Sequence, residues 1–310
     1  MSHWPDIPYD RWKTCGHAIH MWAQIIGKYR LALSPWVNHS WHATLYVNGR
    51  GLTTGLIPYK DSDFEILIDC IDHCLRIHCI NGQQETFDIS NITVAEFDAT
   101  LKEKLKNLKI DVTAHGTPNE VADPVPFVEQ TDPVNYNPDA VHDFWQALLN
   151  INRVFNYFRT GFMGKVSPAH LFWGSFDFAI TRFSGRTAPP HPGGIPALPD
   201  TITREAYSHE VSSAGFWPGA NGIDYPAFYA YAYPTPEGFS KHAVLSKEAF
   251  FHEDLGEFIL PYDAVRQSAD PDQTLLDFLQ STYEAAADLG SWDRKALDRP
   301  FAGPKEIPNI

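Results

Sequence analysis

The feature that most constrains the fold is a series of short alternating segments between residues 41 and 89. Apolar residues recur at every second position in these segments, which is typical of strands with one buried face. Two of the turns between them are Asn48-Gly49 and Asn81-Gly82, and an Asn-Gly pair between two strands favours a tight β-hairpin. The sequence therefore predicts an antiparallel sheet. Its predicted strands cover residues 41–47, a segment that starts near 52, and residues 64–70, 75–79 and 85–89.

Helical segments flank the predicted strands. Asp10 can cap a helix whose apolar residues recur at helical spacing. Thr93 and Glu96 form a capping box before a second helix. Pro138 and Pro271 each stand at the first position of a further helix, where proline lacks only an N–H that has no helical partner. The predicted helices cover about residues 11–28, 94–108, 138–160 and 271–289.

Residues 115–137 are rich in proline, asparagine and aspartate and carry no periodic apolar pattern. They are therefore predicted to be a connecting segment. It divides the chain into an N-terminal half, residues 1–114, and a C-terminal half, residues 138–310, which is expected to carry the functional site. Further strands are predicted at residues 171–183, 208–213, 228–233 and 258–260.

The two halves share one order of parts: a long helix, a Ser-Pro pair, an aromatic strand, a Gly-Arg pair, more strands and a closing helix. Few identities align, so an ancient duplication and a chance likeness both stay open. The sequence predicts an α+β fold of two similar halves, each an antiparallel sheet flanked by long helices. If the chain arose by duplication, a ligand cleft is expected between the halves, because binding sites favour such interfaces.

Composition limits the classes of partner. The net charge is −14, from 24 basic and 38 acidic residues, and nucleic acid and anionic membranes both favour basic surfaces. No run of about 18 apolar residues is present, and the first residues do not resemble a signal peptide. Four cysteines in 310 residues do not make a disulfide framework. We therefore expect a cytoplasmic protein without a nucleic-acid or membrane partner, whose oligomeric state the sequence does not indicate.

The segment REAYSHEVSSAGFWPG holds a carboxylate and a histidine four residues apart, Glu205 and His209. On a helix or on a strand, these two side chains point the same way. Such a pair can act as an oriented general base, or bind a divalent metal with a third ligand from elsewhere. A hydrogen-bonded structural pair is the alternative. We predict Glu205 and His209 as catalytic residues and as candidate metal ligands.

An aspartate within an aromatic strand is the second unusual feature. A regular strand over HLFWGSFDFAITRF would place Asp177 on the same face as Trp173, with His170 at its entrance. We predict Asp177 as catalytic and the other two as ligand-binding. A structural bond from Asp177 to an arginine or to the backbone is the alternative. The possible partners of Asp177 are Arg182, Arg186 and His209.

Arg50 and Arg186 each follow a glycine at the end of a predicted strand, where a guanidinium group can bind a carboxylate or a phosphate. Hydrogen bonds that close the turn are the alternative. Trp217, in GFWPG, can form the floor of a pocket, and His42 and His20 can complete the cleft from the first half. We predict Arg50, Arg186, Trp217 and His42 as ligand-binding residues.

Several motifs together resemble a known family. They are WHATLYVNGRGLTTG, HLFWGSFDFAITRFSGR, EAYSHEVSSAGFWPG, FYAYAYP and LQSTYEAAADLGSWDR. The chain resembles an uncharacterised bacterial family of about 300 residues, domain of unknown function family 5996, from Trp4 to about Leu297. The resemblance implies one unit of this length. It implies no activity.

Two functions stay open on these residues. The first is an enzyme that acts on a small polar or anionic metabolite in an aromatic-lined cleft, by His/carboxylate acid–base chemistry or metal-assisted chemistry. The second is a non-catalytic protein that binds or senses a small molecule. The sequence contains no nucleotide-cofactor motif, and a divalent metal is the cofactor that it leaves open.

Overall fold

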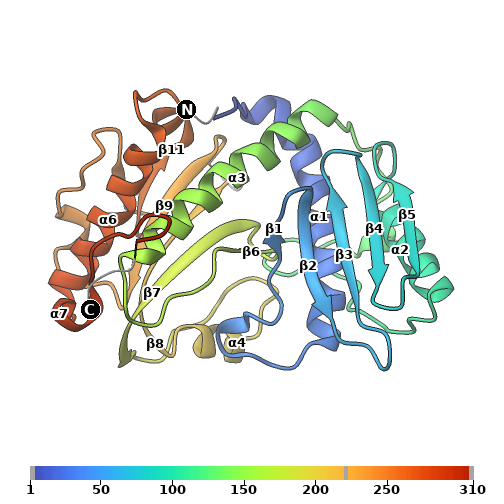
Figure 1. Ribbon diagram of the computed structural model, residues 1–310, viewed down its shortest axis with the longest axis horizontal. Helices are drawn as coiled ribbons and strands as arrows, with labels where there is room; N and C mark the ends of the chain where they lie inside the picture. The colour runs from blue at the N-terminus through green and yellow to red at the C-terminus, as the bar shows by residue number, and fades with distance from the viewer. Residues whose placement is uncertain (1–3, 220–222, 307–310) are drawn as a thin grey trace.

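The computed structural model describes residues 4–219 and 223–306, and its strands form two antiparallel sheets. Those of the first sheet lie in chain order, as successive hairpins require, and the predicted Asn-Gly turns join β1 to β2 and β4 to β5 (Figure 1). The strands of the first sheet are β1 (Tyr46–Val47), β2 (Gly51–Ile57), β3 (Phe64–Asp69), β4 (Cys74–Cys79) and β5 (Gln84–Asp88).

The second sheet has the order β10-β11-β9-β8-β7-β6. Strands β6 to β9 again pair in chain order, as successive hairpins, whereas β11 lies between β10 and β9. The strands of the second sheet are β6 (His170–Phe172), β7 (Asp177–Thr187), β8 (His209–Trp217), β9 (Ala227–Tyr233), β10 (Phe250–His252) and β11 (Glu257–Pro261).

The two sheets meet edge to edge where β1 approaches β6 (Figure 1). Leu45 and Leu171 form an antiparallel bridge, and the backbone N–H of each donates to the carbonyl oxygen of the other at 2.9 Å. We call this bridge the seam. It joins the two halves of the chain through backbone hydrogen bonds.

Three of the main helices begin where the sequence predicts, at Val94, Pro138 and Pro271. Thr93 and Glu96 form the capping box, and Asn137 and Asp270 accept hydrogen bonds from the first turns of their helices. Asp10 does not cap the first helix, which begins at Tyr9; Asp10 lies in its first turn. The main helices are α1 (Tyr9–Leu33), α2 (Val94–Asn107), α3 (Pro138–Thr160) and α6 (Pro271–Leu289). Shorter ones are α4 (Asp200–Ala206), α5 (Tyr262–Arg266) and α7 (Arg294–Leu297).

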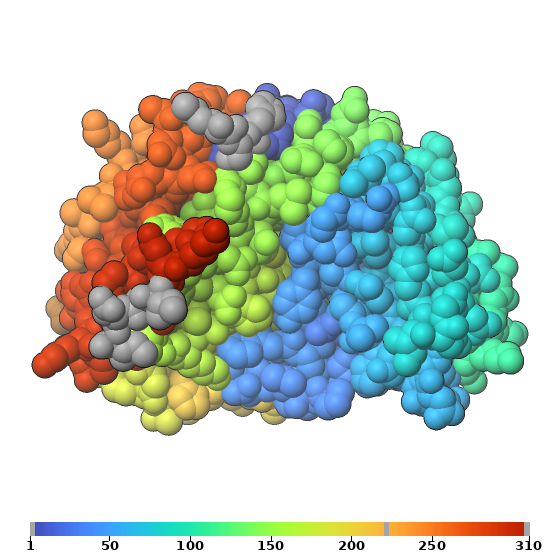
Figure 2. Space-filling view, in the orientation of Figure 1, coloured from blue at the N-terminus to red at the C-terminus, as the bar shows by residue number. Residues whose placement is uncertain are grey.

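The structure is therefore α+β, with two antiparallel sheets and long flanking helices, as predicted. Helices α1 and α2 pack against the five-stranded sheet, and α3 and α6 cover one face of the six-stranded sheet (Figure 1). One continuous cluster of buried apolar side chains runs through both halves. Figure 2 shows the two halves in contact across the face in view. None of the helices of the described residues is long and apolar enough to cross a membrane.

The predicted strand over residues 171–183 is wrong, because a turn at residues 173–176 divides it into β6 and β7. Phe176 has a φ of 60°, a conformation that sequence patterns rarely indicate for a bulky side chain. Trp173 therefore lies in the turn and does not share a strand face with Asp177, the first residue of β7.

Alternation along β7 separates Asp177 from one of its predicted partners. Arg182 is five residues further on, so it points to the opposite face of the sheet, toward α3 and α6. Its guanidinium group lies over the rings of Phe158 and Tyr283, at 3.5 and 4.3 Å, and donates to the carbonyl oxygen of Phe158 at 2.5 Å. The opposite face of the sheet, which carries Asp177, is not the one that α3 and α6 cover.

Candidate functional site

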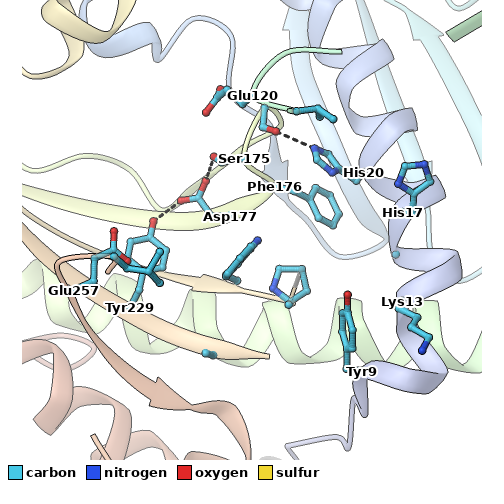
Figure 3. Close-up of a pocket in the computed structure, with 18 of the residues that line it drawn as sticks. Tyr9, Lys13, His17, His20, Glu120, Ser175, Phe176, Asp177, Tyr229 and Glu257 are labelled. Atoms are coloured by element: carbon cyan, nitrogen blue, oxygen red, sulfur yellow. Dashed lines mark hydrogen bonds between the residues drawn. The ribbon is translucent and has the colours of Figure 1, made fainter. Parts of the chain in front are cut away.

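A cavity of about 640 Å³ lies between α1 and the face of the six-stranded sheet that carries Asp177. Its walls come from both halves of the chain. The first half contributes α1, the connecting segment contributes Glu120 and Val121, and the second half contributes the β6–β7 turn and parts of β7, β8, β9 and β11. Figure 3 draws 18 of the residues that line it.

One face of α1 lines the cavity because its side chains recur three and four residues apart. The innermost of them, His20, packs its ring against Phe176 with 4.8 Å between ring centroids. Its Nε2 lies 3.0 Å from the carbonyl oxygen of Trp173 and 2.9 Å from that of Gly174. Nε2 must therefore carry the proton, and burial lowers the pKa of His20 to about 4. The lining residues of α1 are Tyr9, Trp12, Lys13, Gly16, His17, His20 and Met21.

Asp177 lies at the centre of the acidic end of the cavity. Its two carboxylate oxygens accept hydrogen bonds from the hydroxyls of Ser175 and Tyr229 (Figure 3). Burial raises the pKa of Asp177, although both hydroxyls stabilise the charged form. Gly215, opposite Tyr229 in the sheet, leaves room for this arrangement, because a Cβ there would collide with the tyrosine hydroxyl.

Two glutamates flank Asp177 in the same cavity. Burial raises the pKa of Glu120 to about 7, the negative charge of Asp177 adds to the rise, and Lys28 opposes it. Burial also raises the pKa of Glu257 to about 7, again with a contribution from Asp177. Asp177 is therefore close enough to influence both glutamates, and both glutamates titrate near neutral pH.

Tyrosine rings form the wall beside these carboxyl groups. Tyr229 and Tyr231 project from the same face of β9, and their rings stack with 6.0 Å between centroids. The hydroxyl of Tyr231 lies 2.8 Å from that of Tyr207, which also lines the cavity. Trp217, at the end of β8, contributes a further aromatic surface. The cavity thus combines aromatic faces with a cluster of carboxyl groups.

Glu257→Gln is expected to stabilise the ligand-free protein at about pH 8 by ~2–3 kcal/mol. The pKa of Glu257 is about 7 in the folded protein, above its ordinary value of 4.5, so ionisation is disfavoured on folding. The stability that this group contributes is fully present below about pH 4.5 and is lost as the pH rises through about 7. Glutamine does not ionise and avoids that loss. Urea unfolding at about pH 5 and 8 measures the difference, which should be much smaller at the lower pH.

Glu253→Gln is the matched control, because Glu253 is exposed in the β10–β11 turn. Its stability is expected to stay within about 0.5 kcal/mol of the wild type at both pH values. A Glu257→Gln protein that is less stable than the wild type at about pH 8 would contradict the raised pKa.

Of the site residues predicted from the sequence, Asp177 and Trp217 line the cavity, and so does His20. Three others lie in the protein core or near it. The indole N–H of Trp173 donates to the carbonyl oxygen of Ala43 at 2.7 Å. His170 and His42 are buried, and their Nδ1 atoms lie 2.5 Å from the carbonyl oxygen of Pro168 and 3.2 Å from that of Val37.

The two predicted anion-binding arginines lie outside the cavity and have carboxylate partners. Arg50 donates to Asp69 and Asp72, both at 2.6 Å. Asp69 is fully buried. Burial alone would raise its pKa, but the bond from Arg50, with other donors, lowers it to about 2. Arg186 donates to Glu210 at 2.6 Å and to the carbonyl oxygen of Gly290 at 2.6 Å. Arg50 thus holds the turn before β2 to the end of β3, and Arg186 holds β7 to β8 and to the C-terminal end of α6.

Glu205 and His209 lie on different elements, Glu205 on α4 and His209 at the start of β8. Glu205 accepts the indole N–H of Trp36 at 2.8 Å, and Nδ1 of His209 lies 3.1 Å from the hydroxyl of Ser208. Neither lines the cavity. Within residues 4–219 and 223–306, no group of three or more His, Cys, Asp or Glu side chains is arranged to hold a metal ion. Their catalytic and metal-binding roles stay predictions.

Sequence reasoning missed Glu120, Glu257 and Tyr229. Glu120 stands in the Pro-rich connecting segment, where a single carboxylate carries no pattern. Glu257 precedes three apolar residues in EFIL and belongs to no alternating pattern. Tyr229 stands on a strand whose alternate positions are apolar, and that alternation was visible in FYAYAYP. It indicated that a set of polar and aromatic side chains shares one sheet face, but not what lies opposite that face.

Comparison with known proteins gives one match. Residues 4–299 match the model of a family of unknown function (DUF5996), which confirms the resemblance seen in the motifs. No curated protein and no solved structure was found to match. Because the match covers nearly all of the 310 residues, the chain belongs to this family of unknown function, DUF5996.

Proposed function

We propose that this protein is an enzyme that acts on a small polar metabolite in the cavity, by acid–base chemistry of its carboxyl groups. The observation that carries the proposal is the cluster of Asp177, Glu120 and Glu257 in one cavity with aromatic walls. A cavity of about 640 Å³ is large enough for a metabolite.

The electrostatics of the cluster favour proton transfer. A carboxyl group with a pKa of about 7 is present in both its acid and its base form at neutral pH, so it can donate or accept a proton. Asp177 links the two glutamates, because its charge raises the pKa of both. A carboxylic acid and a carboxylate in one cavity allow one group to act as acid while another acts as base. We therefore assign this role to the cavity rather than to Glu205 and His209.

Conversion of a metabolite by the purified protein tests the proposal. The full chain is incubated with a small-molecule extract of cells, and mass spectrometry follows which compounds disappear and which appear. We expect one compound to be consumed and one product to form, at a rate that depends on protein concentration. Asp254→Asn, an exposed aspartate in the β10–β11 turn, is the control variant and should convert the compound at the wild-type rate.

A non-catalytic binding or sensing protein is the second candidate, and one observation favours it. Both carboxylate oxygens of Asp177 already accept hydroxyl hydrogen bonds, a geometry that also suits the orientation of a ligand. In this case the same experiment shows a compound that binds the protein and is not converted. If no compound is converted and no compound binds, both functions are excluded for the cavity.

We also propose that the two halves arose by duplication. Each sheet begins with a short edge strand that follows a long helix and continues as successive hairpins. The seam between them is an antiparallel pair with reciprocal hydrogen bonds, which is a local two-fold arrangement.

The predicted cytoplasmic location stays part of the proposal. All four cysteines are free thiols in the structure, as a reducing compartment favours.

A further inference from the structure

We propose that the molecule bound in this cavity carries a positive charge, an ammonium or guanidinium group that lies among Asp177, Glu120 and Glu257. The inference rests on the proposed function, because it names the class of molecule that would occupy the same cavity. Three independent features support it: the distribution of charge in the cavity, the lack of hydrogen-bond partners at the glutamates, and the aromatic wall.

Charge is distributed unevenly along the cavity. Figure 3 shows Glu120, Asp177 and Glu257 on one side, whereas Lys13 lies on the far side with α1. Lys13 is about half exposed and is paired with Asp10 at 2.7 Å. Lys28, whose positive charge lowers the pKa of Glu120, bonds to Oδ1 of Asn119 and lies 5.1 Å from the centre of the Trp173 ring, outside the cavity lining. Among the described residues that line the acidic end, no lysine or arginine accompanies the carboxyl groups.

The two glutamates lack donors. Among the described residues, no hydrogen-bond donor meets the side chain of Glu120 or of Glu257. The carboxyl group of Glu120 lies directly over Gly174, which leaves room for it, because a Cβ there would collide with it. Both glutamates are half-buried, and burial disfavours their ionised form. A group that supplies both N–H donors and positive charge offsets this cost. An ammonium or guanidinium group supplies both.

The aromatic wall favours the same class of ligand. The Tyr229 and Tyr231 rings stack beside Asp177, and Trp217 lines the same space. The faces of aromatic rings attract a cation that lies within about 6 Å of the ring centre. An anionic ligand would meet the three carboxyl groups instead, and a neutral polyol would gain neither the charge pairing nor the cation–π contact.

Binding should also depend on pH in a defined direction. A cation binds the ionised carboxyl groups, and burial raises the pKa of Glu120 and Glu257 to about 7 in the empty cavity. Protons must therefore leave when a cation binds near neutral pH. Binding is expected to strengthen as the pH rises through about 7, and to release protons to the buffer.

Titration calorimetry of the full chain with three probes of equal carbon-chain length tests the inference. Putrescine carries two ammonium groups, succinate carries two carboxylates, and butanediol carries two hydroxyls. We expect putrescine to bind more tightly at about pH 8 than at about pH 6, with heats that change with the ionisation enthalpy of the buffer. We expect succinate and butanediol not to bind. Binding of succinate, or no binding of putrescine at millimolar concentration, would overturn the inference.

Two variants locate the site. Glu257→Gln keeps the shape of the side chain and is expected to weaken putrescine binding at least ~10-fold. Glu253→Gln removes an exposed charge from the adjacent turn and should leave the affinity within about 2-fold of the wild type. If both variants lose the same putrescine affinity, putrescine responds only to the general negative charge of the protein, and the proposed site is wrong.

Failure of this inference and failure of the proposed function give different results. If the protein converts a metabolite that carries no positive charge and putrescine does not bind, the enzyme stands and the cationic ligand is wrong. If putrescine binds with the expected pH dependence and no metabolite is converted, the cationic ligand stands and the protein is a binding protein.

Discussion

Asp177→Asn is expected to lower the rate of metabolite conversion by about 10²–10⁴-fold, the range that a general acid or base contributes. Asp177 lies between the two glutamates and raises the pKa of both, so its charge affects every proton position in the cluster. Asparagine has nearly the same shape but carries no charge. Its amide N–H₂ group must also face a hydroxyl that now donates to Asp177, either that of Ser175 or that of Tyr229.

The pH profile separates loss of chemistry from loss of structure. Burial is the larger cause of the raised pKa values of Glu120 and Glu257, so without the charge of Asp177 these values should fall only in part, and residual conversion should have a pH profile shifted to lower pH. Thermal unfolding should show that Asp177→Asn is folded, and Asp254→Asn should keep the wild-type rate. A folded Asp177→Asn protein with wild-type conversion would show that Asp177 takes no part in the reaction.

Arg182→Ala is expected to lower the free energy of unfolding by about 3–5 kcal/mol. Arg182 is 1% exposed, and its guanidinium group is enclosed by the rings of Phe158, Phe162 and Tyr283. Burial lowers its pKa to about 9, which shows how far the group is removed from water. Alanine would leave a void among these rings and remove the donor to the Phe158 carbonyl oxygen. Urea unfolding measures the change.

Two further variants separate packing from charge. Arg182→Met fills most of the same volume without a cation, so it should recover part of the stability that alanine loses but not all of it. Arg204→Ala, at an exposed position on α4, should change the stability by less than about 0.5 kcal/mol. If Arg182→Met equals the wild type, the cation–π contacts contribute nothing and only packing matters at this position.

Features that depend on neighbours along the chain could be predicted from the sequence. The hairpin turn at Asn48-Gly49, the capping box at Thr93 and the helix starts at Pro138 and Pro271 each depend on a few adjacent residues, and each is present in the structure. Alternation of apolar residues likewise places β3, β4, β5, β9 and β11 within one or two residues of their observed bounds. The strand predicted over residues 41–47 is shorter in the structure, Tyr46–Val47, and the one predicted over residues 208–213 continues to Trp217. These local signals are enough to indicate the α+β class and the antiparallel sheets.

Features that depend on distant residues could not be predicted in this way. The turn at residues 173–176 is held by His20, which is more than a hundred residues earlier in the chain. The pKa of Glu257 is raised by burial in the folded protein and by the charge of Asp177, a residue on another strand. Arg186 looked free for a ligand because Glu210 and the carbonyl of Gly290 become its neighbours only in the folded protein. The candidate site is assembled almost wholly from contacts of this second kind.

The seam between β1 and β6 has a consequence for solubility. An exposed strand edge is a template on which a second chain can add a strand, and two separate sheets would present four such edges. Pairing Leu45 with Leu171 turns two of them toward each other. Of the outer edges, β5 carries the charged side chains of Glu85 and Asp88, and β10 is three residues long. If the chain were cut between its halves, the edges of β1 and β6 would be exposed. We therefore expect each separate half to self-associate more readily than the whole molecule.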